Sequence, residues 1–451
     1  MRKTTATLII ALFVSALISA QSDDELFGAA DGDFFTDDGI VELESSAEET
    51  SGTPADELGQ GILFRTGSVK IGGNFDLSLA SVTPFRDGKT FGDSLHDTLL
   101  VPKADAQLTV DARPSENLRL YMKSGIHYPY TTQSTAMLIS AKFSGANVVI
   151  SPSGFEFQNL FYIKELFSDF NAGDYAAFRF GKQTVTWGTG YFFSPADVIN
   201  LTAIDPENPT EQVEGPLALR AQFVFPGTQN AVWAYIIPDN SFNFTEYGVG
   251  SYIRNTALAL KGDIVLGGWE FGLGGWYKYK KSPRLMLTAT GTIFRNIGIF
   301  AEGVAAFGKD NAKDDQWAES YGGTREMVFQ ATAGFMRYWK NPKITLAAQY
   351  YYNGQETYIS AADGLLTEIK ATRGSNLAAS ASFGKIFTSD LSATVFAMMN
   401  FDSTSGTTSA MLKYSPIDEF SVSMGPYITW TDGDRPVTAV KILFDLGKGK
   451  F

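Results

Sequence analysis

The chain has 451 residues, with 44 Gly, no Cys, two His and a formal net charge of -13. The lack of Cys excludes a disulfide framework, a thiol nucleophile, a zinc site built on Cys and a lipidated N-terminal Cys. Hydrophobic residues make up 44% of the chain, yet the mean hydropathy is close to zero, so apolar and polar residues are interleaved. Such a composition is typical of half-exposed strands, in which every second side chain meets an apolar phase.

The negative charge is concentrated near the N-terminus. Residues 21–60 contain 13 Asp and Glu and no Lys or Arg, whereas residues 61–451 contain 36 Asp and Glu against 34 Lys and Arg. The larger part of the chain is therefore nearly neutral, and it has no basic patch of the kind that binds nucleic acid.

Residues 1–20 are predicted to be a secretory signal peptide. Arg2 and Lys3 form a charged start, Leu8 to Leu17 form an apolar core, and Ala20 is the small residue before a cut. A membrane anchor is the less favoured interpretation, because the apolar run is too short to span a bilayer core. No later segment has 18 consecutive apolar residues, so an exported chain of this kind is periplasmic, secreted or a barrel.

Residues 21–60 are predicted to be an acidic, weakly ordered extension. The segment is rich in Ser, Gly and Thr and has no sustained period. The favoured interpretation is a solvated linker. The alternative is a tail that docks on a basic periplasmic partner, for which Phe27 and the pair Phe34-Phe35 are the available hydrophobic residues.

From residue 62 onward the pattern has a period of two. Val69, Ile71 and Leu77 share one face of the first run, and Lys70 and Asp76 share the other. The pattern recurs in later runs near 118–122, 217–225, 269–279, 297–301, 344–352, 391–399 and 440–446. Many runs reach the ten residues that a tilted strand needs to cross a membrane. Aromatic residues near run ends are predicted to form interfacial girdles: Trp233, Tyr277, Tyr338-Trp339, Tyr427 and Trp430.

The connections between runs alternate in length. Short connections include 171–174, 226–230 and 340–342. The longer ones are predicted at 81–103, 128–157, 187–215, 239–250, 309–324 and 355–370, with 136–151 either a further hairpin or part of the second long loop. This alternation predicts an all-β, antiparallel, up-and-down transmembrane barrel over residues 61–451, with about 18 strands, and 16 are also compatible. Both termini are then periplasmic.

Two segments carry a resemblance to a known family. The runs GKQTVTWG (181–188) and SPADVIN (194–200) resemble a segment of bacterial porin-like outer-membrane proteins, in which a Gly-(Arg/Lys)-Gln strand end leads through Trp-Gly into a Pro-x-Asp-x-x-Asn loop. The terminal Phe451 resembles the aromatic end that the barrel-assembly machinery recognises. It departs in register, because the apolar residues from Val440 to Leu446 have even numbers and Phe451 has an odd one. The resemblance implies that the third long loop, 187–215, folds inward and narrows the channel.

Strand parity and loop position select the candidate lining of this constriction. The lining residues are Lys70, Arg119, Lys123, Arg179, Gln183, Asp197, Asp205, Glu207 and Arg220. An acidic loop opposite a basic wall would set up a transverse field that orients dipolar solutes. The alternative is that these charges pair with one another, pin the loop and plug the lumen. The loop aromatics Trp187, Tyr191, Phe192 and Phe193 are predicted to anchor the loop rather than to stack on sugars.

The predicted function is passive diffusion of small hydrophilic solutes through an outer-membrane porin-like channel. The alternative is a non-conducting adhesin or envelope tether. An enzyme is not predicted, because His96 and His127 have no recognisable nucleophile motif beside them, and no cofactor or metal is expected. The expected partners are outer-membrane lipids, the assembly machinery at the C-terminal strand and the solutes, and the sequence leaves a homotrimer open.

Overall fold

The computed structural model describes most of the barrel segment. The described residues are 64–66, 68–85, 90–128, 160–173, 175–201, 204–210, 212–238, 253–279, 281–294, 296–308, 327–354, 373–417, 419–431, 433 and 435–450. The predicted signal peptide, the acidic extension and the segment 136–151 lie outside these residues.

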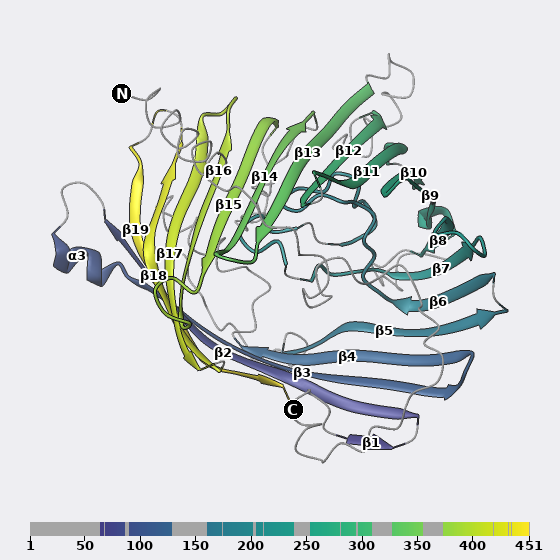
Figure 1. Cartoon of the computed structure of the whole chain (residues 1–451), viewed down its shortest axis with the longest axis horizontal. Helices are drawn as coiled ribbons and strands as arrows, with labels where there is room; N and C mark the ends of the chain where they lie inside the picture. The colour runs from purple at the N-terminus through teal and green to yellow at the C-terminus, as the bar shows by residue number, and fades with distance from the viewer. Residues whose placement is uncertain are drawn as a thin grey trace. The chain divides into compact units, whose positions relative to one another are not determined.

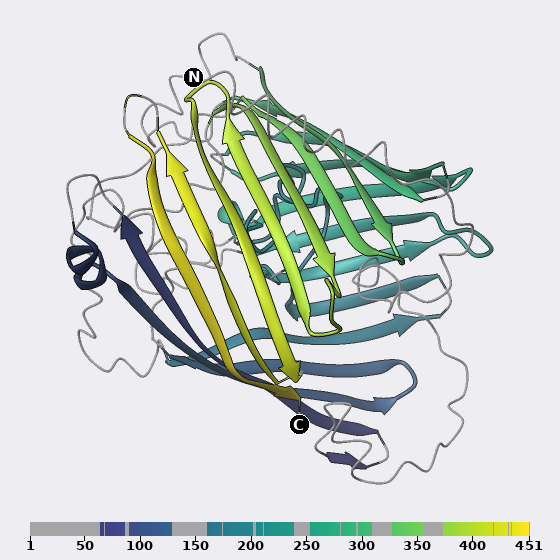
Figure 2. The ribbon, with the colours of Figure 1, turned by 60° about the vertical axis from the view of Figure 1, so that its left-hand side comes forward.

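The strands follow one another around a single antiparallel sheet (Figures 1 and 2). They are β1 (Phe64–Thr66), β2 (Val69–Phe85), β3 (Leu99–Ser115), β4 (Leu118–Tyr128), β5 (Phe161–Ala172), β6 (Ala176–Lys182), β7 (Leu217–Val224), β8 (Ala231–Ile237), β9 (Ala257–Leu266), β10 (Trp269–Tyr277), β11 (Arg284–Ile293), β12 (Ile297–Phe307), β13 (Met327–Trp339), β14 (Lys343–Asn353), β15 (Gly374–Gly384), β16 (Leu391–Asn400), β17 (Ser405–Ile417), β18 (Phe420–Trp430) and β19 (Val437–Lys450). Each pairs with its sequence neighbours, and β19 pairs with β2, so β2 to β19 form a closed ring of 18 strands. The predicted all-β, antiparallel, up-and-down barrel of about 18 strands is confirmed.

The seam between β19 and β2 contains a β-bulge. Up to Asp445 the pairing follows one register, and it shifts by one residue before Gly447. Even-numbered residues of β19 share a face with Leu79 before the shift, whereas Gly447 and Gly449 lie opposite Leu77 and Phe75 after it. The bulge therefore explains the change of parity in the sequence beyond Leu446. Phe451 itself lies outside the described residues.

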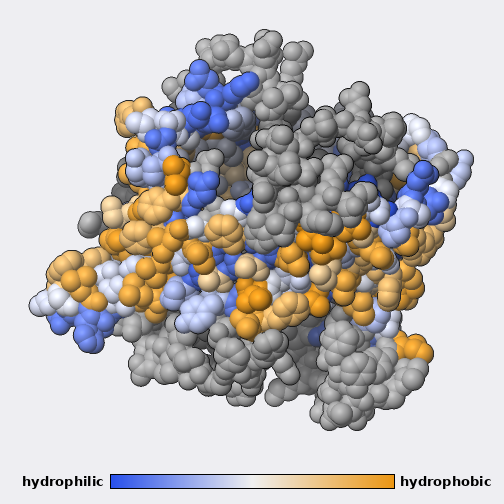
Figure 3. Space-filling model, turned by 90° about the horizontal axis from the view of Figure 1, so that it is seen from below, coloured by the Kyte–Doolittle hydropathy of each residue, from blue (hydrophilic) through white to orange (hydrophobic). Residues whose placement is uncertain are grey.

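The outer face of the barrel is apolar. In β10, Phe271 and Leu273 are exposed, and the alternate residues Gly272 and Gly274 belong to the inner face. The same alternation gives exposed Leu, Phe, Ile and Tyr on the outside of the neighbouring strands. Figure 3 shows apolar residues as a band across one side of the molecule. An apolar outer band on a closed sheet is the arrangement of a transmembrane barrel, because closure leaves no backbone group unpaired in lipid.

Two of the predicted girdle aromatics face the interior instead. Trp233 pairs with Gln222 and Lys261 on the lumen face and is buried, and Tyr427 is also buried there. The prediction for these two residues is wrong. It relied on their position near the end of a run and did not follow which face of the strand the alternation assigns to them.

The first predicted long loop, 81–103, is also shorter than expected. β2 continues to Phe85, β3 starts at Leu99, and the helix α3 (Phe91–His96) lies between them. Thr90 and Asp93 cap this helix reciprocally: the Thr90 hydroxyl accepts from the Asp93 N–H, and the Asp93 carboxylate accepts from the Thr90 N–H at 2.9 Å. Among the residues that the structure describes, no helix is long and apolar enough to cross a membrane.

The orientation of β17 gives a direct test of the lipid-facing side. Leu412 is exposed on the outer face, and the adjacent Lys413 belongs to the lumen face. We expect Leu412→Arg to lower the free energy of unfolding by about 2–4 kcal/mol, because an arginine near the middle of the lipid layer is poorly solvated. Urea titration of the barrel in vesicles measures this change. Lys413→Leu is the matched control, and an equal loss in both variants would contradict the assigned faces.

Candidate functional site

The connection between β6 and β7 leaves the wall and crosses the barrel interior (Figure 1). Its two legs start side by side, because the Gln183 N–H donates to the Pro216 carbonyl at 3.1 Å and Gln183 Nε2 donates to the Ala218 carbonyl at 3.0 Å. Gly215 fits here because a Cβ at this position would overlap the Gln183 carbonyl. Gln183 is fully buried, so it fixes the start of the loop and is not exposed to the lumen.

The tip of the loop closes around one carboxylate on the opposite wall. Glu302, a buried residue of β12, accepts hydrogen bonds from the N–H groups of Thr189 and Gly190 at 2.5 Å and of Ala196 at 2.9 Å. It also accepts from the Ser194 hydroxyl at 3.1 Å. Three backbone donors and one hydroxyl directed at a single carboxylate form an anion-binding nest. The nest requires a close approach at Gly190, where a Cβ would overlap the Phe193 carbonyl.

A second wall residue holds the next turn of the loop. Gln349 of β14 is buried, and its Oε1 accepts from the N–H groups of Tyr191, Phe192 and Phe193 at 3.1, 2.6 and 3.2 Å. Its Nε2 donates to the Phe193 carbonyl at 2.5 Å and to Thr332 Oγ1 at 2.6 Å. One amide thus satisfies four backbone groups of the tip. With Glu302, it fixes the position of the tip against β12 and β14.

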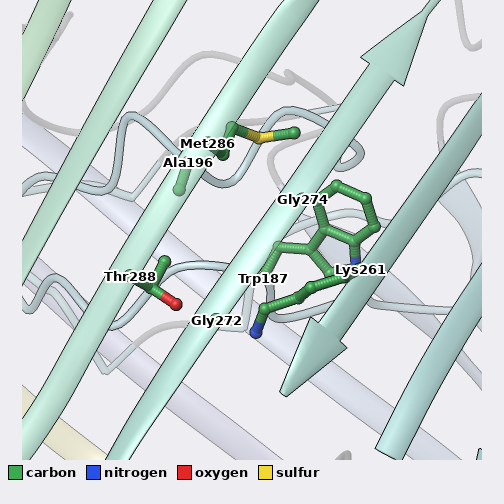
Figure 4. A pocket seen from close by; sticks show the side chains of 7 residues that line it. All are labelled: Trp187, Ala196, Lys261, Gly272, Gly274, Met286 and Thr288. Atoms are coloured by element: carbon green, nitrogen blue, oxygen red, sulfur yellow. The ribbon is translucent and has the colours of Figure 1, made fainter. Parts of the chain in front are cut away.

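The predicted loop aromatics lie in two apolar clusters. Trp187 packs with Ala196 and Met286 beside Lys261, and Figure 4 shows these side chains lining one small pocket over β9, β10 and β11. Gly274 leaves space for the indole, since a Cβ there would lie 3.4 Å from Trp187 Cζ3.

Phe192 and Phe193 form the second cluster. They pack with Tyr351 and Phe396 of β14 and β16, and Tyr191 packs against the same group. The Phe193 ring stacks on Tyr351 with centroids 5.1 Å apart. Burial of these rings adds to the polar contacts at Glu302 and Gln349, so apolar and polar contacts hold the tip together.

The returning leg of the loop contacts a third part of the wall. The Tyr427 hydroxyl of β18 donates to Glu207 Oε1 at 2.8 Å. Burial raises the pKa of Glu207, and Lys441 opposes this shift. The Glu207 N–H donates to the Asp205 carboxylate at 3.0 Å, and Lys123 Nζ donates to Gln212 Oε1 at 3.0 Å. The leg is therefore tied to β18 and to β4.

Two arginines of the predicted basic wall pair with carboxylates of the wall itself. Arg179 makes two hydrogen bonds to Asp169, at 2.6 and 3.1 Å, and its guanidinium lies 3.8 Å from the centre of the Phe167 ring. Arg119 makes two bonds of 3.0 Å to Asp111. Both arginines thus pair with wall carboxylates, and the loop carboxylates contact other groups.

The remaining candidate residues differ in exposure. Arg220 is buried and lies 5.4 Å over the Trp233 ring. Lys70 is exposed at the start of β2, opposite Asp111. The Arg119 side chain keeps 31% of its surface exposed, so it is among the candidates that face the open part of the interior.

Glu302 and Gln349 are the functional contacts that sequence reasoning missed. The sequence offered one signal for them, the two-residue period of the strand. Each is a polar residue at an inward position between apolar outward neighbours. Parity alone does not separate them from other inward polar residues.

His127 was the residue on which a hydrolase would have depended. It lies opposite Asp105 across β3 and β4, and its ring centre is 5.2 Å from that of Tyr162. The Tyr162 hydroxyl donates to the Asp105 carboxylate at 2.8 Å. Among the described residues, no group of three or more His, Asp or Glu is placed to hold a metal ion.

Asp197 has an unusual protonation behaviour. Burial raises its pKa to about 7, a hydrogen bond from Asn200 lowers it, the Glu302 carboxylate raises it and Lys261 lowers it. Asn200 Nδ2 donates to both Asp197 oxygens at 2.9 Å and to the Val185 carbonyl at 2.5 Å. Asp197 and Asn200 together cross-link the outgoing leg of the loop.

The raised pKa gives a pH prediction. The folded protein holds the Asp197 proton more tightly than the unfolded chain, whose Asp pKa is near 3.8, so this contribution to stability is complete below that value and is lost as the pH rises through about 7. We expect the urea midpoint of the native protein to fall between pH 5 and pH 8 relative to that of Asp197→Asn. Parallel pH profiles of the two proteins would contradict this assignment.

Removal of the Glu302 carboxylate tests the nest. Glu302→Ala leaves the N–H groups of Thr189, Gly190 and Ala196 without their acceptor, at a cost of about 1–3 kcal/mol for each buried donor. We expect amide hydrogen exchange at these three residues to accelerate at least about tenfold. The control is Glu214→Gln, which removes a half-exposed ion pair with Lys182 at the base of the loop. Unchanged exchange at the tip in Glu302→Ala would rule out the nest.

Comparison with known proteins gives structural similarity only. No protein-family model matches the sequence, and no curated protein gives a match. The chain is similar to the solved structure of OpdQ of Pseudomonas aeruginosa, at 9% identity and a TM-score of 0.49, over 85% of this chain and 97% of that one. OccAB4 of Acinetobacter baumannii gives 9% identity and a TM-score of 0.48 over 85% and 99% of the two chains. The outer membrane protein opdK of Pseudomonas aeruginosa gives 8% and 0.47 over 84% and 98%.

Proposed function

We propose that the protein is an outer-membrane channel for passive diffusion of small hydrophilic solutes, with the 187–215 loop as its constriction. The observation that carries this proposal is the attachment of the loop tip to Glu302 and Gln349, which belong to β12 and β14, whereas the loop starts from β6. A loop held in this way narrows the interior at a fixed place. It does so without adding a strand to the wall.

The exposed side chains of the inner face support a hydrated passage beside the loop. Lys413 of β17 has 46% of its side-chain surface exposed, Arg119 of β4 has 31%, and Asp445 of β19 has 19%. These lumen-facing charges come from strands that lie on either side of the β19–β2 seam. Charged side chains that keep contact with water favour polar solutes, because apolar solutes find no compensating contacts there.

The proposed location follows from the apolar outer band and from the sequence. An exported chain with a cleaved signal peptide and a closed, lipid-compatible barrel fits the outer membrane. The short turns then face the periplasm, and outer-membrane lipids surround the barrel. Recognition of the C-terminal strand by the barrel-assembly machinery and a homotrimeric assembly are further parts of this proposal.

A non-conducting surface or tethering barrel is the second candidate. The observation in its favour is the neutralisation of the wall cations by Asp111 and Asp169, which fits charges that pin structure rather than guide solutes. Burial of the loop residues Phe192 and Phe193 against the barrel wall points the same way. In this case the loop is a plug.

Single-channel conductance in a planar bilayer separates the two functions. We expect stable openings from the native barrel and larger openings from a variant that lacks residues 190–210, since this deletion removes the tip of the constriction. The double variant Glu302→Ala with Gln349→Ala keeps the full chain length and is expected to give larger or noisier openings, because the tip loses both of its polar anchors.

Two results would contradict a conducting channel. Silence of the native barrel with openings only after the deletion would identify a plug. Silence of all three folded proteins would overturn the channel and favour adhesion or tethering. Glu214→Gln serves as the matched control, because it changes one carboxylate of the loop without touching the tip.

A further inference from the structure

An arginine lies on the lipid-facing side of the barrel near one end of β13. Arg337 pairs across the sheet with Ile297 of β12 and Leu346 of β14, and it shares the parity of the exposed Met327 and Phe329. The side chain is half-buried, and β13 ends two residues later at Trp339. A cation on the lipid-facing side is costly near the middle of a bilayer but is tolerated at the level of the headgroups.

The protein itself only partly satisfies this cation. The Arg337 guanidinium lies 4.4 Å from the centre of the Trp339 ring, which holds it flat against the indole. With its side-chain amide oriented to suit both neighbours, Asn296 accepts from Arg337 Nη2 at 3.2 Å and donates to the Phe294 carbonyl at 2.9 Å. Arg337 Nε and Trp339 Nε1 have no hydrogen-bond acceptor among the described residues.

Lys182 is another cation on the outer face, and it has a partner within the chain. It pairs with Leu166 and Leu217, so it also belongs to the outer face, but Glu214 neutralises it at 2.5 Å. No described carboxylate lies within ion-pair distance of Arg337. Arg337 can therefore pair with an anion that the described residues do not supply.

We propose that Arg337 and Trp339 form a binding site for the phosphodiester headgroup of a membrane phospholipid at the short-turn end of the barrel. The terminal Nη1 and Nη2 groups of the planar guanidinium match phosphate oxygens bidentately, and the Trp339 ring holds the guanidinium in place. The site is continuous with the apolar band, so the acyl chains of the same lipid lie along the outer face of the neighbouring strands. Phe294, 83% exposed in the turn that contains Asn296, supplies an additional apolar contact at this level.

The free energies of charge-assisted hydrogen bonds set the expected size of the effect. Such bonds contribute roughly 1.5–3 kcal/mol each, which corresponds to about a 10- to 100-fold change in affinity. The inference rests on the membrane location proposed above and not on conduction. A silent barrel would leave it intact.

Native mass spectrometry of the detergent-solubilised, full-length barrel with dioctanoyl phosphatidylglycerol tests the site. We expect one tightly retained lipid, with affinity reduced at least about tenfold in Arg337→Ala and less in Arg337→Lys, which keeps the charge but loses the planar fork. Trp339→Phe keeps an aromatic ring against the guanidinium, so a smaller loss is expected. The matched control is Lys343→Ala, which removes one positive charge at the same end of the wall. Lys343 precedes the outward-facing Ile344 and therefore lies on the inner face.

Two probes separate the sources of binding. Dioctanoylglycerol lacks the phosphate and is expected to be retained weakly and equally by all variants, whereas inorganic phosphate lacks the chains and is not expected to compete at equal concentration. The proposal is overturned if Lys343→Ala loses as much phosphatidylglycerol affinity as Arg337→Ala does. Full competition by inorganic phosphate, or equal retention of the phosphate-free lipid by the native protein, would also overturn it. Circular dichroism of each variant confirms that the barrel is folded.

Discussion

The requirement that every buried backbone N–H find an acceptor organises this molecule at two levels. In the wall it closes the sheet, because lipid offers no acceptor and an unpaired edge strand is excluded. Inside the barrel it governs the loop, whose chain leaves the wall after Lys182 and rejoins it at Leu217. Between these points the tip has no ladder to bond to. Glu302 and Gln349 take the place of a neighbouring strand and accept from Thr189, Gly190, Ala196 and the run from Tyr191 to Phe193.

The charged residues of the interior differ in the partner that compensates their charge. Arg119 and Arg179 are neutralised by Asp111 and Asp169, so they stabilise the wall and contribute little field at a distance. Glu302 is neutralised by dipoles of the loop rather than by a cation. Lys413 lies 3.8 Å from an oxygen of Asp445, but 46% of its side-chain surface stays exposed. The transverse field expected from an acidic loop and a basic wall is thus weaker than formal charges suggest.

Much of the fold could be predicted from the sequence, because the two-residue period of a strand is local and every run carries it. The failures at Trp233 and Tyr427 share one cause: an aromatic near a run end fits either face unless its parity is followed. The helix between β2 and β3 had a local signal in Thr90 and Asp93 that was not used. Glu302 and Gln349 had only their inward position as a signal, which other polar residues share, because the loop that they bind is more than 100 residues away in the chain.

The anchoring of the tip through its main chain has a consequence for how such a loop can vary. Hydrogen bonds from backbone N–H groups do not depend on the side chains of Thr189 or Tyr191, so substitutions there leave the polar anchor in place. The constraint falls on Gly190, where a side chain would collide with the Phe193 carbonyl, and on the two acceptors of the wall. The position of the loop tip and its surface chemistry are therefore set by different residues. Side chains of the loop that face the interior can change while the position of the tip stays fixed.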